Sequence, residues 1–207
     1  GLLTSLSFAS LGYSVFCVDP KKPVTQSNDD GADLRTTAFL QPAKTFMASL
    51  GLWEKLEPFA EPMEIMRIID SAGDNWPPIE TTAKDFLASE ISDLPFGWNI
   101  PNWLLRRTLL ENAMEYSNLE LKFGLTTSSI IRRDDAAFVY LNDGSQIKSK
   151  LIIGADGRDS LVRNKSQIKI SKREFSQKAL TFIVTHEKPH KNASIEIHRS
   201  GGPFTFV

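Results

Sequence analysis

The stretch Leu151–Arg163, LIIGADGRDSLVR, decides the fold of this chain. The apolar residues Leu151–Ile153 predict a buried strand, and the small residues after them predict a tight turn that carries the Asp156 carboxylate. A helix is expected from Asp159 onward. Open α/β sheets bind ligands outside the carboxyl ends of their strands, so this order predicts an α/β domain with Asp156 at its ligand site. A connection without a ligand is the alternative, because Asp-Gly is also a common turn.

The beginning of the chain predicts the second half of a βαβ unit. Leu2–Leu11 has helical spacing with Gly12 as its stop, and Ser14–Asp19 is an apolar run typical of a buried parallel strand. If Gly1 is the last glycine of a GxGxxG loop, Asp19 falls where an acidic residue binds the ribose of a dinucleotide. The alternative is a surface helix followed by an Asp-Pro turn.

The remaining elements alternate between helical and strand-like patterns. Periodicity predicts helices over Thr37–Leu50 (with Pro42 in its first turn), Leu52–Phe59 and Pro101–Tyr116. Apolar runs and alternation predict strands over Met63–Asp70, Leu119–Phe123, Ser129–Ile131, Ala137–Leu141, Gln146–Ile153, Leu180–His186, Ser194–His198 and Phe204–Val207. Asp143-Gly144 predicts a hairpin, and Ala72–Pro78 a turn or loop. The sequence therefore predicts an α/β (α+β) fold, with a nucleotide-binding domain and a mainly antiparallel second sheet.

Composition excludes several classes of protein. The 207 residues suffice for one large domain, or one domain and part of a second. With 24 basic and 25 acidic residues, the chain has no excess of positive charge for nucleic acid. No apolar run approaches the roughly 18 residues of a membrane span. Cys17 is the single cysteine and is expected in the core, which fits a cytoplasmic, reducing compartment. Because the first helix starts at residue 1 and the last strand stops at Val207, we expect a fragment of a longer protein.

Arg35 is a second candidate for the ligand site. It stands in DLRTTA, directly before the helix predicted from Thr37. An arginine in that position can bind a phosphate, and the free N–H groups at the start of the helix can donate hydrogen bonds to the same phosphate. The alternative is a solvated surface arginine.

Taken together, these blocks resemble a known family. LIIGADGRDSLVR resembles the DG motif of the para-hydroxybenzoate hydroxylase superfamily of FAD-dependent monooxygenases. Within that superfamily the ubiquinone-biosynthesis aromatic-ring hydroxylases are similar to Asp33–Asp70 (DLRTTAFLQPAKTFMASLGLWEKLEPFAEPMEIMRIID), Pro95–Ala113 (PFGWNIPNWLLRRTLLENA) and Gly201–Val207 (GGPFTFV). The resemblance covers nearly the whole chain, and corresponds to about the first half of a typical member.

The resemblance implies a set of cofactor-binding residues. They would contact the pyrophosphate, the ribose and the flavin of FAD, and they are Gly1, Asp19, Arg35, Asn102, Arg106, Asp156 and Gly157. Arg107, Ser160 and Arg163 are expected to be structural. The implied FAD-binding domain comprises residues 1–61 and 97–170, and the substrate-binding sheet domain comprises 62–96 and 171–207. The family's later GD motif, which binds the ribityl chain, lies beyond the last residue.

The resemblance also implies the reaction. NAD(P)H reduces FAD, O2 adds to the reduced flavin, and the resulting hydroperoxide hydroxylates an electron-rich ring, here a polyprenylated phenol of ubiquinone biosynthesis. No catalytic side chain and no metal are required. The implied partners are the aromatic substrate, O2, a membrane surface contacted peripherally and a multi-enzyme quinone-biosynthesis assembly, with no nucleic acid.

Two other interpretations remain open. Phe96–Pro101, FGWNIP, resembles the WxWxIP box of flavin-dependent halogenases, although Phe96 replaces the first Trp. The second interpretation is a non-catalytic remnant. The histidines His186, His190 and His198 do not form a zinc pattern, and we expect them on the surface or on strands.

Overall fold

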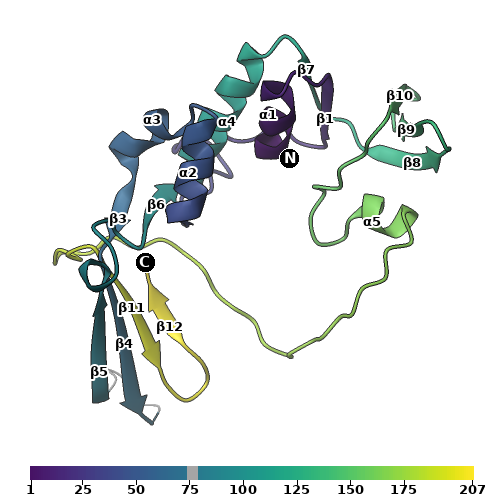
Figure 1. Cartoon of the computed structure of the whole chain (residues 1–207). Helices are drawn as coiled ribbons and strands as arrows, with labels where there is room; N and C mark the ends of the chain where they lie inside the picture. The colour runs from purple at the N-terminus through teal and green to yellow at the C-terminus, as the bar shows by residue number, and fades with distance from the viewer. Residues whose placement is uncertain (74–78) are drawn as a thin grey trace. The chain divides into compact units, whose positions relative to one another are not determined.

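The computed structural model of the chain describes residues 1–73 and 79–207 (Figure 1). Its α-helices are α1 (Leu2–Ser10), α2 (Gln41–Ser49), α3 (Trp53–Leu56), α4 (Asn102–Glu115) and α5 (Leu161–Lys165). Its strands are β1 (Val15–Asp19), β2 (Thr36–Leu40), β3 (Glu61–Met63), β4 (Ile65–Ala72), β5 (Ile79–Leu87), β6 (Gly97–Pro101), β7 (Leu119–Phe123), β8 (Thr127–Arg132), β9 (Ala137–Leu141), β10 (Gln146–Ser149), β11 (Ala193–His198) and β12 (Phe204–Phe206). Short 3₁₀ turns cover Glu57–Phe59 and Ala88–Glu90.

The chain divides into two compact units. Unit 1 comprises residues 1–23 and 109–180, and unit 2 comprises residues 24–108 and 181–207. The division falls within α4, so one helix contributes to both units. The domain boundaries expected from the sequence, 1–61 with 97–170 and 62–96 with 171–207, stay a prediction.

Unit 1 contains the helix–strand pair expected at the start of the chain. Strand β1 pairs in parallel with β7, with Val15 opposite Leu119 and Asp19 opposite Phe123. Helix α1 packs against β1, and Gly12 adopts φ +85° just beyond the helix end. That conformation strongly favours glycine, so the predicted stop is confirmed. The predicted burial of Cys17 in β1 is also confirmed.

The second part of unit 1 is a three-stranded antiparallel sheet in the order β10-β9-β8. The predicted hairpin between β9 and β10 is confirmed, with Gly144 at φ +86°. Its connection is longer than the Asp-Gly pair alone, because it runs over Asn142–Ser145. Asp143 Oδ1 fixes the turn by accepting hydrogen bonds from the Ser145 amide at 2.9 Å and the Ser145 hydroxyl at 2.6 Å.

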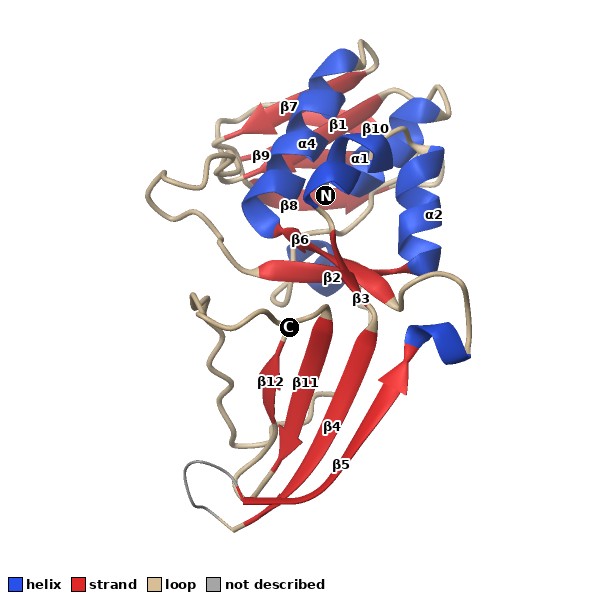
Figure 2. Ribbon diagram, turned by 90° about the vertical axis from the view of Figure 1, so that its left-hand side faces the viewer, coloured by secondary structure: helices blue, strands red, loops and turns tan. Residues whose placement is uncertain are grey.

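Unit 2 contains two sheets. The smaller one has the order β2-β6-β3, and both of its strand pairs are antiparallel. The larger one has the order β12-β11-β4-β5, and Figure 2 shows its four strands side by side. Within it β11 pairs in parallel with β4, while the other two pairs are antiparallel. The expected second sheet is therefore present and mixed, and the α/β (α+β) fold class is confirmed.

A pair of tryptophans lies in the core of unit 2. The rings of Trp53 and Trp98 meet edge to face with centroids 5.3 Å apart, beside the fully buried Leu52. Lys44 Nζ lies 5.1 Å from the Trp53 ring and 4.4 Å from the Trp98 ring. The same ammonium group lies 3.8 Å from Glu57 Oε1, which accepts the indole N–H of Trp53 at 3.0 Å. Polar groups thereby fix the orientation of two large apolar side chains.

The prediction of one helix over Thr37–Leu50 was wrong in its first part. Thr36–Leu40 forms β2 and pairs antiparallel with β6, and α2 begins only at Gln41. The β-branched and aromatic residues of this segment suit a strand, and its cross-strand partners outweigh the local helical spacing. Pro42 lies in the first helical turn, as expected, and so marks the true start of α2.

Two predicted strands do not form. Leu180–His186 has no regular secondary structure and pairs with no strand among the described residues, and Leu180 is 87% exposed. Leu151–Ile153, expected as a buried strand, is an irregular segment in which Leu151 is 63% exposed. A run of apolar residues is not enough to form a strand, because a strand also needs a neighbouring backbone for its hydrogen bonds.

Strand β5 was not predicted, since Ile79–Leu87 mixes charged and apolar residues. It pairs with β4 from Ile65 opposite Leu87 onward, and Arg67 makes a two-point ion pair with Asp85 across the strands. Such pairs stabilise a solvated sheet face. The turn predicted over Ala72–Pro78 falls largely outside the described residues, and its first residue, Ala72, ends β4.

Candidate functional site

Gly1 lies at the N-terminus of α1, as the sequence predicted. It is the N-cap residue, no side chain caps this end of the helix, and the first turn contains no acidic residue. A Cβ atom added at Gly1 would lie 3.9 Å from the Sγ atom of Cys17, an ordinary contact. The uncapped N–H groups and the helix dipole together suit an anionic group.

Asp19 is the last residue of β1, the position that the sequence predicted for it. Its carboxylate oxygen Oδ1 accepts the amide of Lys21 at 2.9 Å, and its side chain is exposed. The backbone carbonyl of Asp19 accepts the amide of Gly124 at 3.0 Å, which fixes the end of β1 beside the end of β7. One carboxylate oxygen remains available to a hydroxyl donor.

Arg35, Asn102 and Arg106 are brought together in unit 2 by a residue that the sequence analysis missed, Asp33. Its carboxylate accepts Arg35 Nε at 2.7 Å and Arg35 Nη2 at 2.8 Å. Oxygen Oδ2 also accepts Asn102 Nδ2 at 3.1 Å and Arg106 Nη2 at 3.2 Å. The side chain of Asp33 is only 11% exposed, whereas those of Arg35 and Arg106 are 51% and 40% exposed.

The start of α4 holds this cluster in place. The amide of Asn102 donates to the carbonyl of Arg35 at 2.8 Å, and the amide of Trp103 donates to the carbonyl of Asp33 at 3.1 Å. The first N–H groups of a helix have no partner within the helix. In α4 the carbonyl groups of Asp33 and Arg35 accept two of them. The Thr37 hydroxyl donates to Asn102 Oδ1 at 2.6 Å, which leaves the Asn102 amide nitrogen directed at Asp33.

The electrostatics of the cluster favour its charged form. Hydrogen bonding from Arg35, joined by that from Asn102, lowers the pKa of Asp33 to about 2 against the opposing effect of burial. The same pairing raises the pKa of Arg35. Two guanidinium groups share one carboxylate, so the cluster keeps a net positive charge even when that carboxylate is ionised. Exposed guanidinium groups of this kind are suited to phosphate.

Asp156 and Ser160 together cap α5. The Ser160 hydroxyl donates to Asp156 Oδ1 at 2.5 Å and accepts the amide of Arg163 at 3.0 Å. Oxygen Oδ2 of Asp156 accepts the amides of Leu161 at 2.7 Å and Val162 at 3.1 Å. Burial opposes ionisation, but these hydrogen bonds outweigh it and lower the pKa of Asp156. Both carboxylate oxygens are therefore engaged within the chain, and Ser160 has the structural role expected of it.

Glycines set the path of the backbone around Asp156. A Cβ atom on Gly154 would lie 2.9 Å from the Cβ of Val162, closer than real side chains come. Gly157 has φ +80° and open space around it. The first glycine allows α5 to approach the preceding segment, and the second allows the turn. The backbone around Gly157 is exposed and is therefore accessible to a ligand.

The predicted site residues thus fall into two groups. Gly1, Asp19, Asp156 and Gly157 belong to unit 1, and the other three belong to unit 2. Within the described part of the chain, hydrogen bonds join the unit 2 residues alone, through Asp33. The motif DLR contains the clue to this residue, since it places Asp33 two positions before Arg35.

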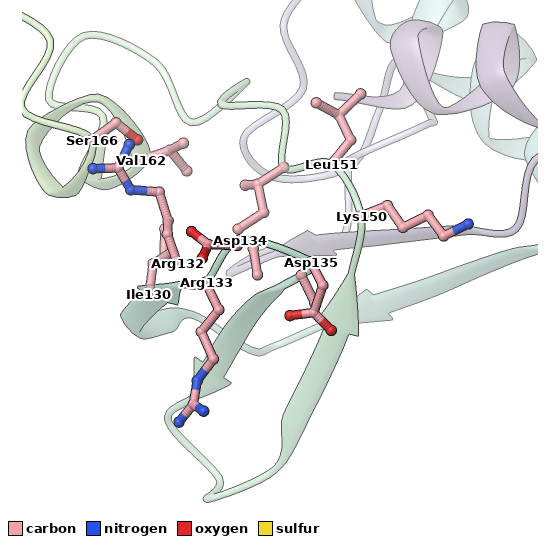
Figure 3. Close-up of a pocket in the computed structure, with 12 residues that line it drawn as sticks. Ile130, Arg132, Arg133, Asp134, Asp135, Lys150, Leu151, Val162 and Ser166 are labelled. Atoms are coloured by element: carbon pink, nitrogen blue, oxygen red, sulfur yellow. The ribbon is translucent and has the colours of Figure 1, made fainter.

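A separate hollow lies in unit 1 between the three-stranded sheet and α5 (Figure 3). Its volume is about 240 Å3, and basic and acidic side chains line it together, among them Arg132, Arg133, Asp134, Asp135 and Lys150. None of the seven predicted cofactor residues lines this hollow. Its mixed charge selects no class of ligand.

The segment that resembles a halogenase box forms β6. Gly97–Pro101 pairs with β2 on one side and β3 on the other, and Trp98 and Ile100 are buried. A Cβ atom on Gly97 would lie 2.6 Å from the carbonyl oxygen of Phe39. Packing accounts for the glycine, tryptophan and isoleucine of this segment, which favours the structural interpretation over the halogenase one.

No helix in the described part of the chain is long and apolar enough to cross a bilayer.

The alignments with two curated relatives cover almost the whole of this chain. It is 27% identical over 203 residues to the ubiquinone hydroxylase UbiL of Rhodospirillum rubrum, covering 97% of this chain and 45% of that protein. It is 23% identical over 204 residues to the 3-demethoxyubiquinol 3-hydroxylase of Escherichia coli, covering 98% of this chain and 50% of that protein. The chain therefore spans about half the length of these relatives.

Solved structures share the fold. The flavin-dependent monooxygenase PieE, solved with FAD and substrate, superposes with a TM-score of 0.65 at 20% identity, over 83% of this chain and 31% of that one. The p-nitrophenol 4-monooxygenase PnpA of Pseudomonas putida superposes with a TM-score of 0.63 at 19% identity, over 80% of this chain and 40% of that one. The family model described as the FAD binding domain matches residues 1–200, and the chain belongs to that family.

Proposed function

We propose that this chain forms the FAD-binding part of a monooxygenase that hydroxylates an aromatic ring. The observation that supports the proposal most is the family match over residues 1–200. The relatives named as hydroxylases of ubiquinone and demethoxyubiquinol align with 97% and 98% of this chain. Their names support a polyprenylated phenol of ubiquinone biosynthesis as the substrate.

The donor groups of the chain fit a dinucleotide. In unit 2 the exposed guanidinium groups of Arg35 and Arg106 would bind the pyrophosphate, and Asn102 would border the flavin. In unit 1 the uncapped N–H groups at Gly1 suit a phosphate. There the Asp19 carboxylate suits the ribose hydroxyls.

The segment of Asp156 and Gly157 contributes differently. The Asp156 carboxylate is engaged in capping α5, so it would act by holding the backbone around Gly157 in shape. That exposed backbone would then meet the cofactor and NAD(P)H.

Bound FAD, reduced by NAD(P)H, supplies the electrons that activate O2. In the balanced reaction one oxygen atom of O2 is inserted into a ring C–H bond, which becomes C–OH. The other oxygen atom leaves as water, with its two hydrogens supplied by the hydride of NAD(P)H and one proton, and NAD(P)H becomes NAD(P)+. The residues of this chain bind and orient the cofactor, and no nucleophile or metal ligand is required of them.

The partners and location follow from the substrate class. A polyprenyl tail partitions into lipid, since each buried methylene contributes about 0.8 kcal/mol. We therefore propose a cytoplasmic protein that contacts a membrane surface peripherally to reach this substrate. A multi-enzyme quinone-biosynthesis assembly is the proposed setting, because successive enzymes could pass on a substrate that does not dissolve in water.

Flavin spectra and NAD(P)H consumption test the proposal. Purified protein supplied with FAD should retain a flavin absorbance band after gel filtration. A short-chain prenylated phenol should then accelerate NAD(P)H oxidation and give a hydroxylated product, with no requirement for halide. A halide-dependent, halogenated product would favour the halogenase interpretation. Protein that cannot be loaded with FAD would support the non-catalytic interpretation.

A further inference from the structure

Asp33 has no place among the residues that the family resemblance or the family match assigns. Its carboxylate nevertheless makes more side-chain hydrogen bonds than any predicted site residue. It accepts two from Arg35, one from Asn102 and one from Arg106, at 2.7 to 3.2 Å. It is largely buried, whereas both of its arginine partners are substantially exposed. This is the geometry of a counter-ion that orients two cations toward something else.

We propose that Asp33 is a positioning residue of the cofactor site, which holds the guanidinium groups of Arg35 and Arg106 to receive the pyrophosphate of FAD. The inference rests on the proposed function and names a residue that this function does not itself require. Arg35 uses Nε and Nη2 on Asp33 and donates from Nη1 to the Thr181 hydroxyl at 3.0 Å. Arg106 uses only Nη2 on Asp33. Both guanidinium groups keep N–H donors for an anion.

The backbone supports the same arrangement. The amides of Asn102 and Trp103 at the start of α4 bind the carbonyls of Arg35 and Asp33. Asp33 is therefore attached both through its backbone and through its carboxylate, and has little freedom to move. A rigid carboxylate fixes two long side chains that would otherwise each lose rotamer entropy when the ligand binds. Preorganisation of this kind increases affinity without adding a contact.

The sign of the effect separates positioning from simple electrostatics. Asp33 carries a negative charge close to the proposed pyrophosphate, so removing that charge alone should strengthen the binding of an anion. A positioning role predicts the opposite, because two guanidinium groups lose their fixed orientation. Asp33→Asn should therefore weaken FAD binding by about tenfold, which corresponds to the loss of one charge-assisted hydrogen bond.

Riboflavin separates a loss of pyrophosphate binding from a general structural defect, because such a defect would weaken riboflavin binding as well. It has the flavin ring and ribityl chain but no phosphate, so its affinity should be the same in the Asp33→Asn protein and in the unsubstituted protein. ADP, which has the diphosphate, should be weakened as FAD is. Fluorescence titration of the full chain with each of the three ligands gives the dissociation constants.

A matched control comes from unit 2 itself. Asp85 makes the same two-point pair with Arg67, at 2.6 and 2.7 Å, on the β4–β5 face outside the predicted site. Asp85→Asn should leave the affinity for FAD unchanged. Should Asp33→Asn fail to fold, Asp33→Glu keeps the charge and displaces it by one methylene. That variant should weaken FAD and ADP binding severalfold relative to riboflavin, because both guanidinium groups move.

Three outcomes can be told apart. Weaker FAD and ADP binding with unchanged riboflavin binding supports the inference. Unchanged or tighter FAD binding in a folded Asp33→Asn or Asp33→Glu protein overturns it, while the proposed function stands. If the unsubstituted protein, supplied with FAD, binds neither FAD nor ADP, the proposed function fails, and the positioning role of Asp33 falls with it.

Discussion

The hydroxyl of Ser160 donates to Asp156 Oδ1 at 2.5 Å, and the two side chains together accept the first three amide groups of α5. Asp156 of the DG segment thus caps α5, the helix that follows it. An N-cap hydroxyl contributes about 1 kcal/mol to stability. We expect Ser160→Ala to lower the free energy of unfolding by about that amount, measured by urea denaturation.

The partner substitution provides a check on this prediction. Asp156→Asn keeps one acceptor oxygen and should be milder than Asp156→Ala, which leaves the amides of Leu161 and Val162 without their acceptor. Because the two side chains act as one cap, the double variant Ser160→Ala/Asp156→Ala should cost less than the sum of the single ones. Strictly additive losses would contradict the shared cap.

Glycine substitutions should separate steric contact from backbone strain. A Cβ on Gly97 would lie 2.6 Å from the Phe39 carbonyl oxygen, so Gly97→Ala must displace β2 from β6. We expect a loss of about 3 kcal/mol. Gly157→Ala has open space but φ +80°, and should cost about 1 kcal/mol. Thermal unfolding of both variants measures the difference, and equal losses would contradict the predicted order.

Acid stability should report on Asp33. Its pKa is about 2 in the folded protein and 3.8 without its partners. A lowered pKa stabilises the fold fully above the unfolded value and ceases to do so as the pH falls from about 4 through about 2. The difference in unfolding free energy between the unsubstituted protein and Asp33→Asn should therefore shrink over that window. We expect a change of about 1 kcal/mol, since solvent screens the pair.

Urea denaturation at several pH values between 2 and 5 gives this difference directly. Asp85, Asp143 and Asp156 also have lowered pKa values, so both proteins should lose stability in acid. The difference between them isolates Asp33. A difference that stays constant across the window would show that its carboxylate gains nothing from Arg35 in the folded state.

Lys44 should stabilise unit 2 through the two tryptophans. Its ammonium group lies 4.4 Å from the Trp98 ring and 5.1 Å from the Trp53 ring, beside Glu57. Lys44→Met keeps the aliphatic stem and removes the charge, and we expect a loss of about 1 kcal/mol. Lys44→Arg keeps the charge and should lose less. Circular dichroism during urea denaturation measures both, and equal stability of the two variants would argue against a cation–π contribution.

Much of the fold could be predicted where local pattern and tertiary pairing agree. Strand β1, its final Asp19 and the stop at Gly12 follow from apolar spacing and a glycine that adopts positive φ. Thr36–Leu40 shows the limit, since its helical spacing was outweighed by pairing with β6, about sixty positions away in the chain. Leu180–His186 shows the reverse, a strand pattern that pairs with no other described strand.

The candidate site could also be predicted only in part, since its arginines were identified and the carboxylate between them was not. Arg35 and Arg106 were recognised from motifs, but these motifs did not indicate that one carboxylate joins both arginines. Asp33 is two residues from Arg35, a local clue, yet its bonds to Asn102 and Arg106 span 69 and 73 positions. Asp156 was expected to face a ligand, and its engagement with the amides of α5 depends on turn geometry that a motif does not specify.

The origin of the oxygen atom tests the central claim most directly. Purified protein loaded with FAD would be supplied with NAD(P)H and a short-chain prenylated phenol under ¹⁸O2, and the product examined by mass spectrometry. The account predicts one added oxygen atom on the aromatic ring, derived from O2 and formed in proportion to the NAD(P)H consumed. NAD(P)H oxidation without an oxygenated ring, or a ring oxygen derived from water, would contradict it.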